Sequence, residues 1–110
     1  MTGNEYQRAA ARTMNPALTR DGQIMHSLLG MSSEVGELQG IWQKLYQGHV
    51  RDYVHEKKEL GDVLWMIAEY CTANGWDLED VMQMNIDKLK ARFPNGFEAE
   101  RSLHRASGDI

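Results

Sequence analysis

Four carboxylates in two matching segments are the residues of this sequence best suited to chemistry. The order acid, aliphatic, glycine, acid, aliphatic occurs at residues 34–38 and again at residues 59–63. In a helix, residues three apart lie about 60° apart around the axis, so each segment presents two carboxylates to one side. If the two helices face each other, four oxygen ligands converge in one cleft. The acids are Glu34, Glu37, Glu59 and Asp62.

Carboxylates brought this close repel one another and stay ionised at neutral pH only with cations between them. Ligand sets made only of oxygen favour magnesium, manganese or calcium. The alternative is that these acids are ordinary solvated helix positions. Glu34 and Glu37 have no Lys or Arg three or four residues away. Gly36 and Gly61 each cost about 1 kcal/mol in a helix relative to Ala, a cost that close helix packing at a site would explain. We therefore favour a metal site.

Iron is disfavoured as the metal. A di-iron helical bundle also uses inward carboxylates, but it needs a His three residues after a Glu. No Glu of this sequence is followed by His at that spacing. We interpret the histidines as surface residues or as residues that support ligands, rather than as ligands. They are His26, His49, His55 and His104.

A second group of polar residues lies further along the chain. In a helix, Asn85, Lys88 and Arg92 fall within about 60° of one another and form a strip with two positive charges. Such a strip can hold phosphate groups and neutralise charge in a transition state. A solvated face with cations near a helix C-terminus is an equally good interpretation of these residues. The tryptophans, at positions 42, 65 and 76, could stack on a base, although core or interface positions are more usual.

Helices must position all of these side chains, since apolar residues recur every three or four positions along most of the chain. We predict helices from about Glu5 to Met14, from about Gly22 to Tyr46, from near Asp52 to Asn74, and from after Asp77 to about Arg92. Residues 97–110 should form one or two helical turns and a loose tail. Short connections favour antiparallel neighbours, so the predicted fold is an all-α four-helix bundle. The apolar stripes should face its core.

Size and composition set the remaining expectations. A chain of 110 residues suits one domain, residues 1–110, and one this small gains stability from self-association. A formal charge of −4, without a basic cluster, makes duplex nucleic acid an unlikely partner. There is no signal peptide and no run of about 18 apolar residues, so we expect a cytoplasmic protein without a membrane partner. One cysteine, Cys71, excludes an internal disulfide.

Taken in order, these motifs resemble those of a known family. Glu34-x-x-Glu37 is followed by Glu59-x-x-Asp62 and then by residues 85–97, NIDKLKARFPNGF. This arrangement is similar to the MazG-type nucleoside triphosphate pyrophosphohydrolases, members of the all-α superfamily that also includes dimeric dUTPases. The similarity spans about residues 24 to 101, while the first 20 residues and the last 10 match no motif.

The resemblance implies magnesium, or manganese in its place, bound by Glu34, Glu37, Glu59 and Asp62. It also implies that Lys88 and Arg92, with Asn85 as a further candidate, contact the phosphates of a nucleoside triphosphate. Hydrolysis between the α and β phosphates would then give a nucleoside monophosphate and pyrophosphate, for nucleotide-pool housekeeping. Related single-domain members assemble as homodimers or homotetramers. Two alternatives stay open: a non-catalytic helical adaptor, and a related phosphohydrolase acting on diphosphates or dUTP.

Overall fold

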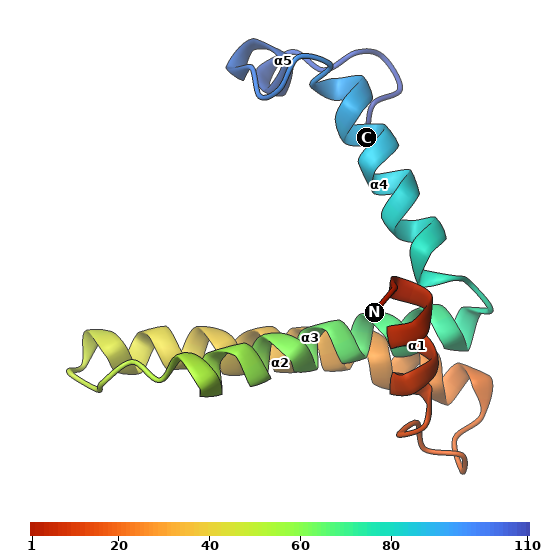
Figure 1. Cartoon of the computed structure of the whole chain (residues 1–110), viewed down its shortest axis with the longest axis vertical. Helices are drawn as coiled ribbons and strands as arrows, with labels where there is room; N and C mark the ends of the chain where they lie inside the picture. The colour runs from red at the N-terminus through yellow and green to blue at the C-terminus, as the bar shows by residue number, and fades with distance from the viewer. The chain divides into compact units, whose positions relative to one another are not determined.

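The computed structural model describes all 110 residues, and it contains five α-helices and no β-strand (Figure 1). The all-α prediction is therefore confirmed. The chain divides into two compact units, Met1–Asp77 and Leu78–Ile110. None of the helices combines the length and the apolar character that crossing a membrane requires. The first unit contains α1 (Gly3–Ala11), α2 (Arg20–Tyr46) and α3 (Tyr53–Asn74), and the second contains α4 (Leu78–Arg92) and α5 (Ala99–Leu103).

Local capping fixes the ends of α2 and α3 close to where the sequence predicts them. Helix α2 ends at Tyr46, as expected. The side chain of Asp52 accepts hydrogen bonds from the backbone N–H groups of Val54 and His55, and so starts α3. Gly75 ends α3 with a φ of 71°, a left-handed conformation that glycine adopts without steric cost. These ends depend on neighbouring residues alone, which is why the sequence predicts them.

Helix α1 lies earlier in the chain than predicted, because it begins at Gly3 rather than at about Glu5 and ends at Ala11 rather than at Met14. The backbone N–H groups of residues 12–14 each bond to the carbonyl three residues back, which is a tighter turn than the α-helix. The residue before a proline is pushed out of the helical conformation, and Asn15 precedes Pro16. The chain therefore leaves the helix before the position that periodicity alone indicates.

Helices α2 and α3 run antiparallel along their length (Figure 1). Early residues of one helix meet late residues of the other, since His26 contacts Glu69 and Trp42 contacts Glu56. Small residues on α2 allow a close approach. Ser27 is fully buried, and its hydroxyl donates to the carbonyl oxygen of Gln23 in the preceding turn.

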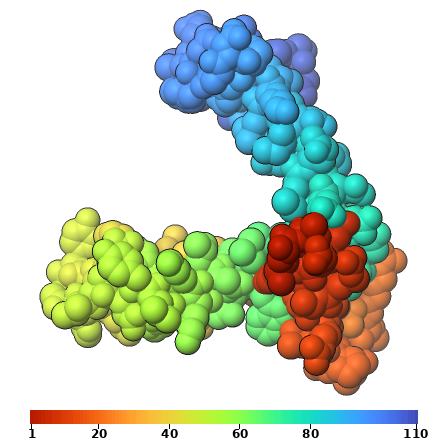
Figure 2. Space-filling view, viewed as in Figure 1, coloured from red at the N-terminus to blue at the C-terminus, as the bar shows by residue number.

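Helix α1 covers the C-terminal end of α3. The side-chain amide of Gln7 donates to the Thr72 hydroxyl at 3.1 Å and to the Trp76 carbonyl oxygen at 2.8 Å. In the space-filling view, the red N-terminal segment lies directly on the end of the green helix (Figure 2). Arg20, in the first turn of α2, donates from Nε to the Ala73 carbonyl oxygen. The last turn of α3 is therefore held by side chains from both other helices of its unit.

The apolar stripes do not form the core of the chain, contrary to prediction. Leu28 on α2 is 45% exposed, and Leu60 and Leu64 on α3 are 51% and 49% exposed. The remaining helix of this unit, α1, packs on the C-terminal end of α3, and α4 belongs to the other unit. The four-helix bundle remains a prediction. The buried residues of the first unit are mostly small or polar: Gln7, Ser27, Met66, Ala68, Glu69, Cys71 and Ala73.

Gly36 and Gly61, which lie between the paired acids, do not pack closely against other residues either. A Cβ atom added to Gly36 or Gly61 would meet no atom within 4 Å, so close packing within the chain does not explain them. The close contact lies instead at Gly30, where an added Cβ would overlap the side chain of Met66. Met66 is 2% exposed and has little room to move.

Gly30→Ala and Gly36→Ala form a matched pair that tests this packing. Both replace a glycine inside α2 and gain about 1 kcal/mol of helix propensity. Gly36→Ala should raise the free energy of unfolding by about that amount. Gly30→Ala should lower it, because overpacking costs roughly 1–3 kcal/mol. Urea unfolding curves measure both effects. A loss of stability in Gly36→Ala would contradict the open surroundings of Gly36 in the single chain.

Candidate metal centre

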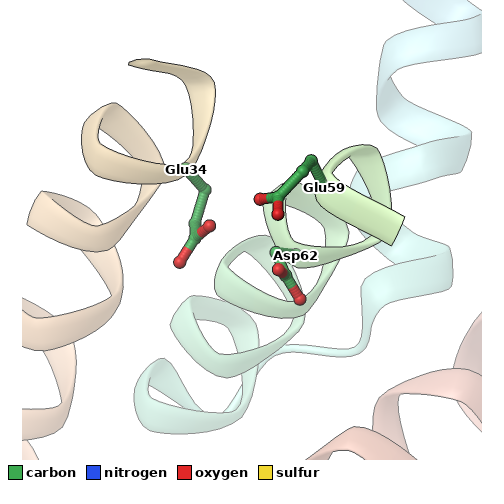
Figure 3. Close-up of side chains that lie close together, drawn as sticks. All are labelled: Glu34, Glu59 and Asp62. Atoms are coloured by element: carbon green, nitrogen blue, oxygen red, sulfur yellow. The ribbon is translucent and has the colours of Figure 1, made fainter. Parts of the chain in front are cut away.

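Three of the four predicted acids converge between α2 and α3. Glu34 projects from α2 toward Glu59 and Asp62 of α3 (Figure 3). Each offers a carboxylate oxygen, and these oxygens lie within 4.8 Å of one another. The antiparallel packing creates the cluster, because it sets the middle of α2 against the N-terminal half of α3. We call Glu34, Glu59 and Asp62 the acidic cluster.

Glu37 lies beside the acidic cluster rather than within it. Its side chain is exposed. Hydrogen bonding with the Glu59 carboxyl group raises the pKa of Glu37 above the usual value, and the charges of Glu34 and Glu59 raise it further. Glu37 is therefore close enough to sense the cluster, while its role as a ligand remains a prediction.

The cluster contains oxygen atoms that lack a partner in the chain. Glu34 Oε2 and Glu59 Oε2 are buried, and neither makes a hydrogen bond. Burial raises the pKa of Glu34, and the charges of Asp62 and Glu59 raise it further. Buried carboxylate oxygens without partners are unfavourable unless a cation or a proton compensates them. The residues present therefore fit a divalent cation with oxygen ligands.

Two further side chains act on the cluster: His55, which the sequence analysis interpreted as a surface residue or one that supports a ligand, and Tyr6, to which it gave no role at the site. His55 Nε2 lies 3.2 Å from Glu59 Oε1, so one oxygen of Glu59 is held while Oε2 is left unpaired. Burial raises the pKa of the Tyr6 hydroxyl on α1, and the charge of Asp62, the other acid of α3, raises it further. In the sequence, Tyr6 is one apolar position of a short helix, and nothing there indicates that the charge of Asp62 affects it.

A hydrogen-bonded pair with one buried partner lies further along the same two helices. His26 Nδ1 is 3.0 Å from both carboxylate oxygens of Glu69, whose side chain is 1% exposed. The sequence analysis gave Glu69 no role. The available signal is its position seven residues after Asp62, which places it on the same face of α3 two turns later.

The predicted phosphate-binding residues lie on α4, in the second unit. Asn85 is exposed there. Arg92 donates from Nε and from a terminal nitrogen to the two carboxylate oxygens of Asp109, each at 2.9 Å. The pKa of Asp109 is lowered mainly by this hydrogen bonding to Arg92, with smaller effects from the charges of Arg105 and Lys88. Lys88 and Arg92 thus both lower the pKa of the same carboxyl group, that of Asp109, which the sequence analysis did not anticipate.

The raised pKa values of Glu34 and Glu37 predict how the stabilisation by a bound cation depends on pH. Above the usual carboxyl value of 4.5, the folded chain keeps protons that the unfolded chain releases, so these two groups destabilise the metal-free fold as the pH rises. A cation replaces those protons. The increase in melting temperature caused by magnesium should therefore grow from about pH 5 to about pH 8.

Thermal unfolding with EDTA and with magnesium chloride, across that pH range, measures this increase. Glu34→Gln is the control, because it removes one of the two titrating groups and should reduce both the increase and its pH dependence. A magnesium effect of equal size at every pH would contradict the assignment of these carboxyl groups.

Comparison with known proteins identifies the family of this chain. The model of the MazG nucleotide pyrophosphohydrolase domain matches residues 24–97, which is more than half of the chain. Searches of curated proteins and of solved structures gave no match. The matched segment contains the acidic cluster and Glu37, and it continues through Asn85, Lys88 and Arg92. The resemblance stated from the motifs is confirmed, and this chain belongs to the MazG nucleotide pyrophosphohydrolase domain family.

Proposed function

We propose that this protein is a magnesium-dependent nucleoside triphosphate pyrophosphohydrolase. Its reaction adds water across the anhydride bond between the α and β phosphates, and it releases a nucleoside monophosphate and pyrophosphate. The observation that carries the proposal is the acidic cluster, with its buried and unpartnered oxygens on Glu34 and Glu59. The family supports the class of reaction.

Glu34, Glu59 and Asp62 would hold the cation, with Glu37 as a further ligand or as a base. Magnesium prefers oxygen ligands and commonly combines a few carboxylates with substrate phosphates and water. Manganese accepts the same ligands. When bound, the cation would polarise the phosphates and lower the pKa of the attacking water.

Glu37 is the candidate for accepting the proton of that water. It is exposed and lies next to Glu59. A base needs a pKa that is raised toward the working pH, and the neighbouring acids raise the pKa of Glu37 in that direction. His55 would keep Glu59 oriented through its contact with Oε1.

On α4, Asn85, Lys88 and Arg92 would bind the phosphates. The planar guanidinium of Arg92 donates two parallel hydrogen bonds to Asp109, and phosphate accepts the same geometry. Asp109 therefore occupies the donors that a phosphate would use, and substrate binding would displace it.

We further propose that the two units act as one catalytic domain and that the protein is a homodimer or homotetramer. The family match crosses the boundary between Asp77 and Leu78, so residues of both units belong to it. A second copy would cover the exposed apolar residues of α2 and α3, such as Leu28 and Leu60.

Glu59→Gln tests the metal assignment. It preserves the shape of the side chain but removes the charge, so pyrophosphate release from triphosphates should fall at least about a hundredfold while the helical content is unchanged. Glu100→Gln is the matched control, because Glu100 is an exposed acid outside the cluster. Phosphorus NMR of the products shows whether the α–β bond is cleaved. Full activity in Glu59→Gln would sink the assignment, and the absence of turnover at every magnesium concentration would favour the adaptor.

Asp109→Asn tests the role of Arg92. If a substrate phosphate must displace Asp109, the variant should lower KM for the triphosphate by at least roughly twofold to fivefold, the range of one exposed ion pair, with kcat unchanged, since this pair is largely covered. Glu98→Gln removes a similar charge from the same unit and should leave KM unaltered. A higher KM in Asp109→Asn would mean that Asp109 positions Arg92 rather than competing with the substrate.

A further inference from the structure

A groove of 380 Å³ lies next to the acidic cluster, entirely within the first unit. Its volume is in the range of small-ligand sites, roughly 300–1,000 Å³. Glu34 belongs to both the groove and the cluster. The other lining residues come from both helices, and they are His26, Leu29, Gly30, Ser33, Trp65 and Met66.

Trp65, which lines this groove, has a polar atom with no partner in the chain. Its Nε1 is buried and makes no hydrogen bond. Buried N–H groups in native proteins are nearly always paired, so an unpaired one requires an explanation. An indole N–H can only donate, and its missing partner must therefore be an acceptor such as a carbonyl oxygen or a ring nitrogen.

The other two tryptophans do not share this feature. Trp42 Nε1 donates to Glu56 at 3.2 Å, and the guanidinium of Arg51 lies 4.7 Å from the centre of its ring. Trp76 packs edge-on against Tyr70. Of the three, Trp65 alone lines the groove that contains a residue of the acidic cluster.

The rest of the groove suits a flat, mostly apolar group. Leu29 and Met66 provide apolar surface, and Gly30 presents no side chain. Ser33 adds a hydroxyl that can donate or accept. His26 is held by Glu69 through Nδ1, so its ring is fixed in orientation at the groove's edge.

We propose that this groove binds the base of the nucleotide, and that the N–H of Trp65 determines specificity by donating to an acceptor on that base. The inference rests on the proposed function, which places the phosphates at the acidic cluster. A nucleotide has an anionic part joined to a flat ring with hydrogen-bond acceptors. The cluster and the groove present the complementary features side by side, with Glu34 common to both.

Trp65→Phe removes the N–H and keeps an aromatic ring. With magnesium present, kcat/KM for nucleoside triphosphates should fall roughly threefold to tenfold, the effect of one lost hydrogen bond. Hydrolysis of ribose 5-triphosphate, which has no base, should be unchanged by the substitution. Trp76→Phe is the matched control and should alter neither substrate. Equal losses for the two substrates in Trp65→Phe would overturn the proposal.

A binding measurement on the unsubstituted protein complements the kinetics. The indole N–H signal of Trp65, assigned by its loss in Trp65→Phe, is followed by NMR in ¹⁵N-labelled protein with magnesium. The α,β-methylene analogues of ATP, CTP, GTP and UTP are added separately, and at least one should shift the signal downfield. Inorganic tripolyphosphate should not shift it.

Three patterns of result are distinguishable. Binding of an analogue by calorimetry without a shift of the Trp65 signal overturns the groove while leaving the pyrophosphohydrolase intact. Failure of every analogue to bind, together with absence of triphosphate hydrolysis, overturns both. A shift confined to base-bearing ligands establishes the groove as the base site.

Discussion

Repulsion among carboxylates held between two packed helices is the constraint on which the rest of this structure depends. The close contact at Ser27 and Gly30 brings α2 against α3, and the same antiparallel packing sets Glu34 against Glu59 and Asp62. The acids lie together because the two helices are packed against each other. Any cation that binds the folded cluster must therefore also stabilise the helix pair, since ligands that bind only the native state shift the folding equilibrium toward it.

The helix pair has little apolar burial to set against this repulsion. The core of the first unit depends on Met66 and small residues, and it includes the buried carboxylate of Glu69, which His26 compensates. Meanwhile Leu28, Leu60 and Leu64 remain about half exposed. A small domain buries a smaller share of its surface than a large one, so cations and further copies of the chain are the available sources of stability. Cation binding at the site and the proposed assembly would therefore both add stability that apolar burial within the chain does not supply.

What could be predicted from the sequence was what neighbouring residues determine. Asp52 and Gly75 set the ends of α3 through local bonds and local conformation, and helical spacing alone put Glu59 and Asp62 on one side. The sequence could not predict what covers the apolar stripes, because periodicity does not say whether the same chain or another copy packs on a helix face. The pairing of Arg92 with Asp109 was equally hidden, since the last residues of the chain match no motif.

The position of Trp65 bears on the choice between a nucleotide and a basic protein partner. A basic segment could neutralise Glu34, Glu59 and Asp62, but its Lys and Arg side chains carry only donors, so only a backbone carbonyl of that segment could pair with the indole N–H of Trp65. A structural cation alone would leave the N–H unpaired and the groove unused. A nucleotide supplies phosphates that combine with a cation at the cluster, and a base whose acceptors can reach the indole. A nucleotide with its cation would pair the carboxylate oxygens through the cation and the N–H through the base, and Glu34 lies in both the cluster and the groove.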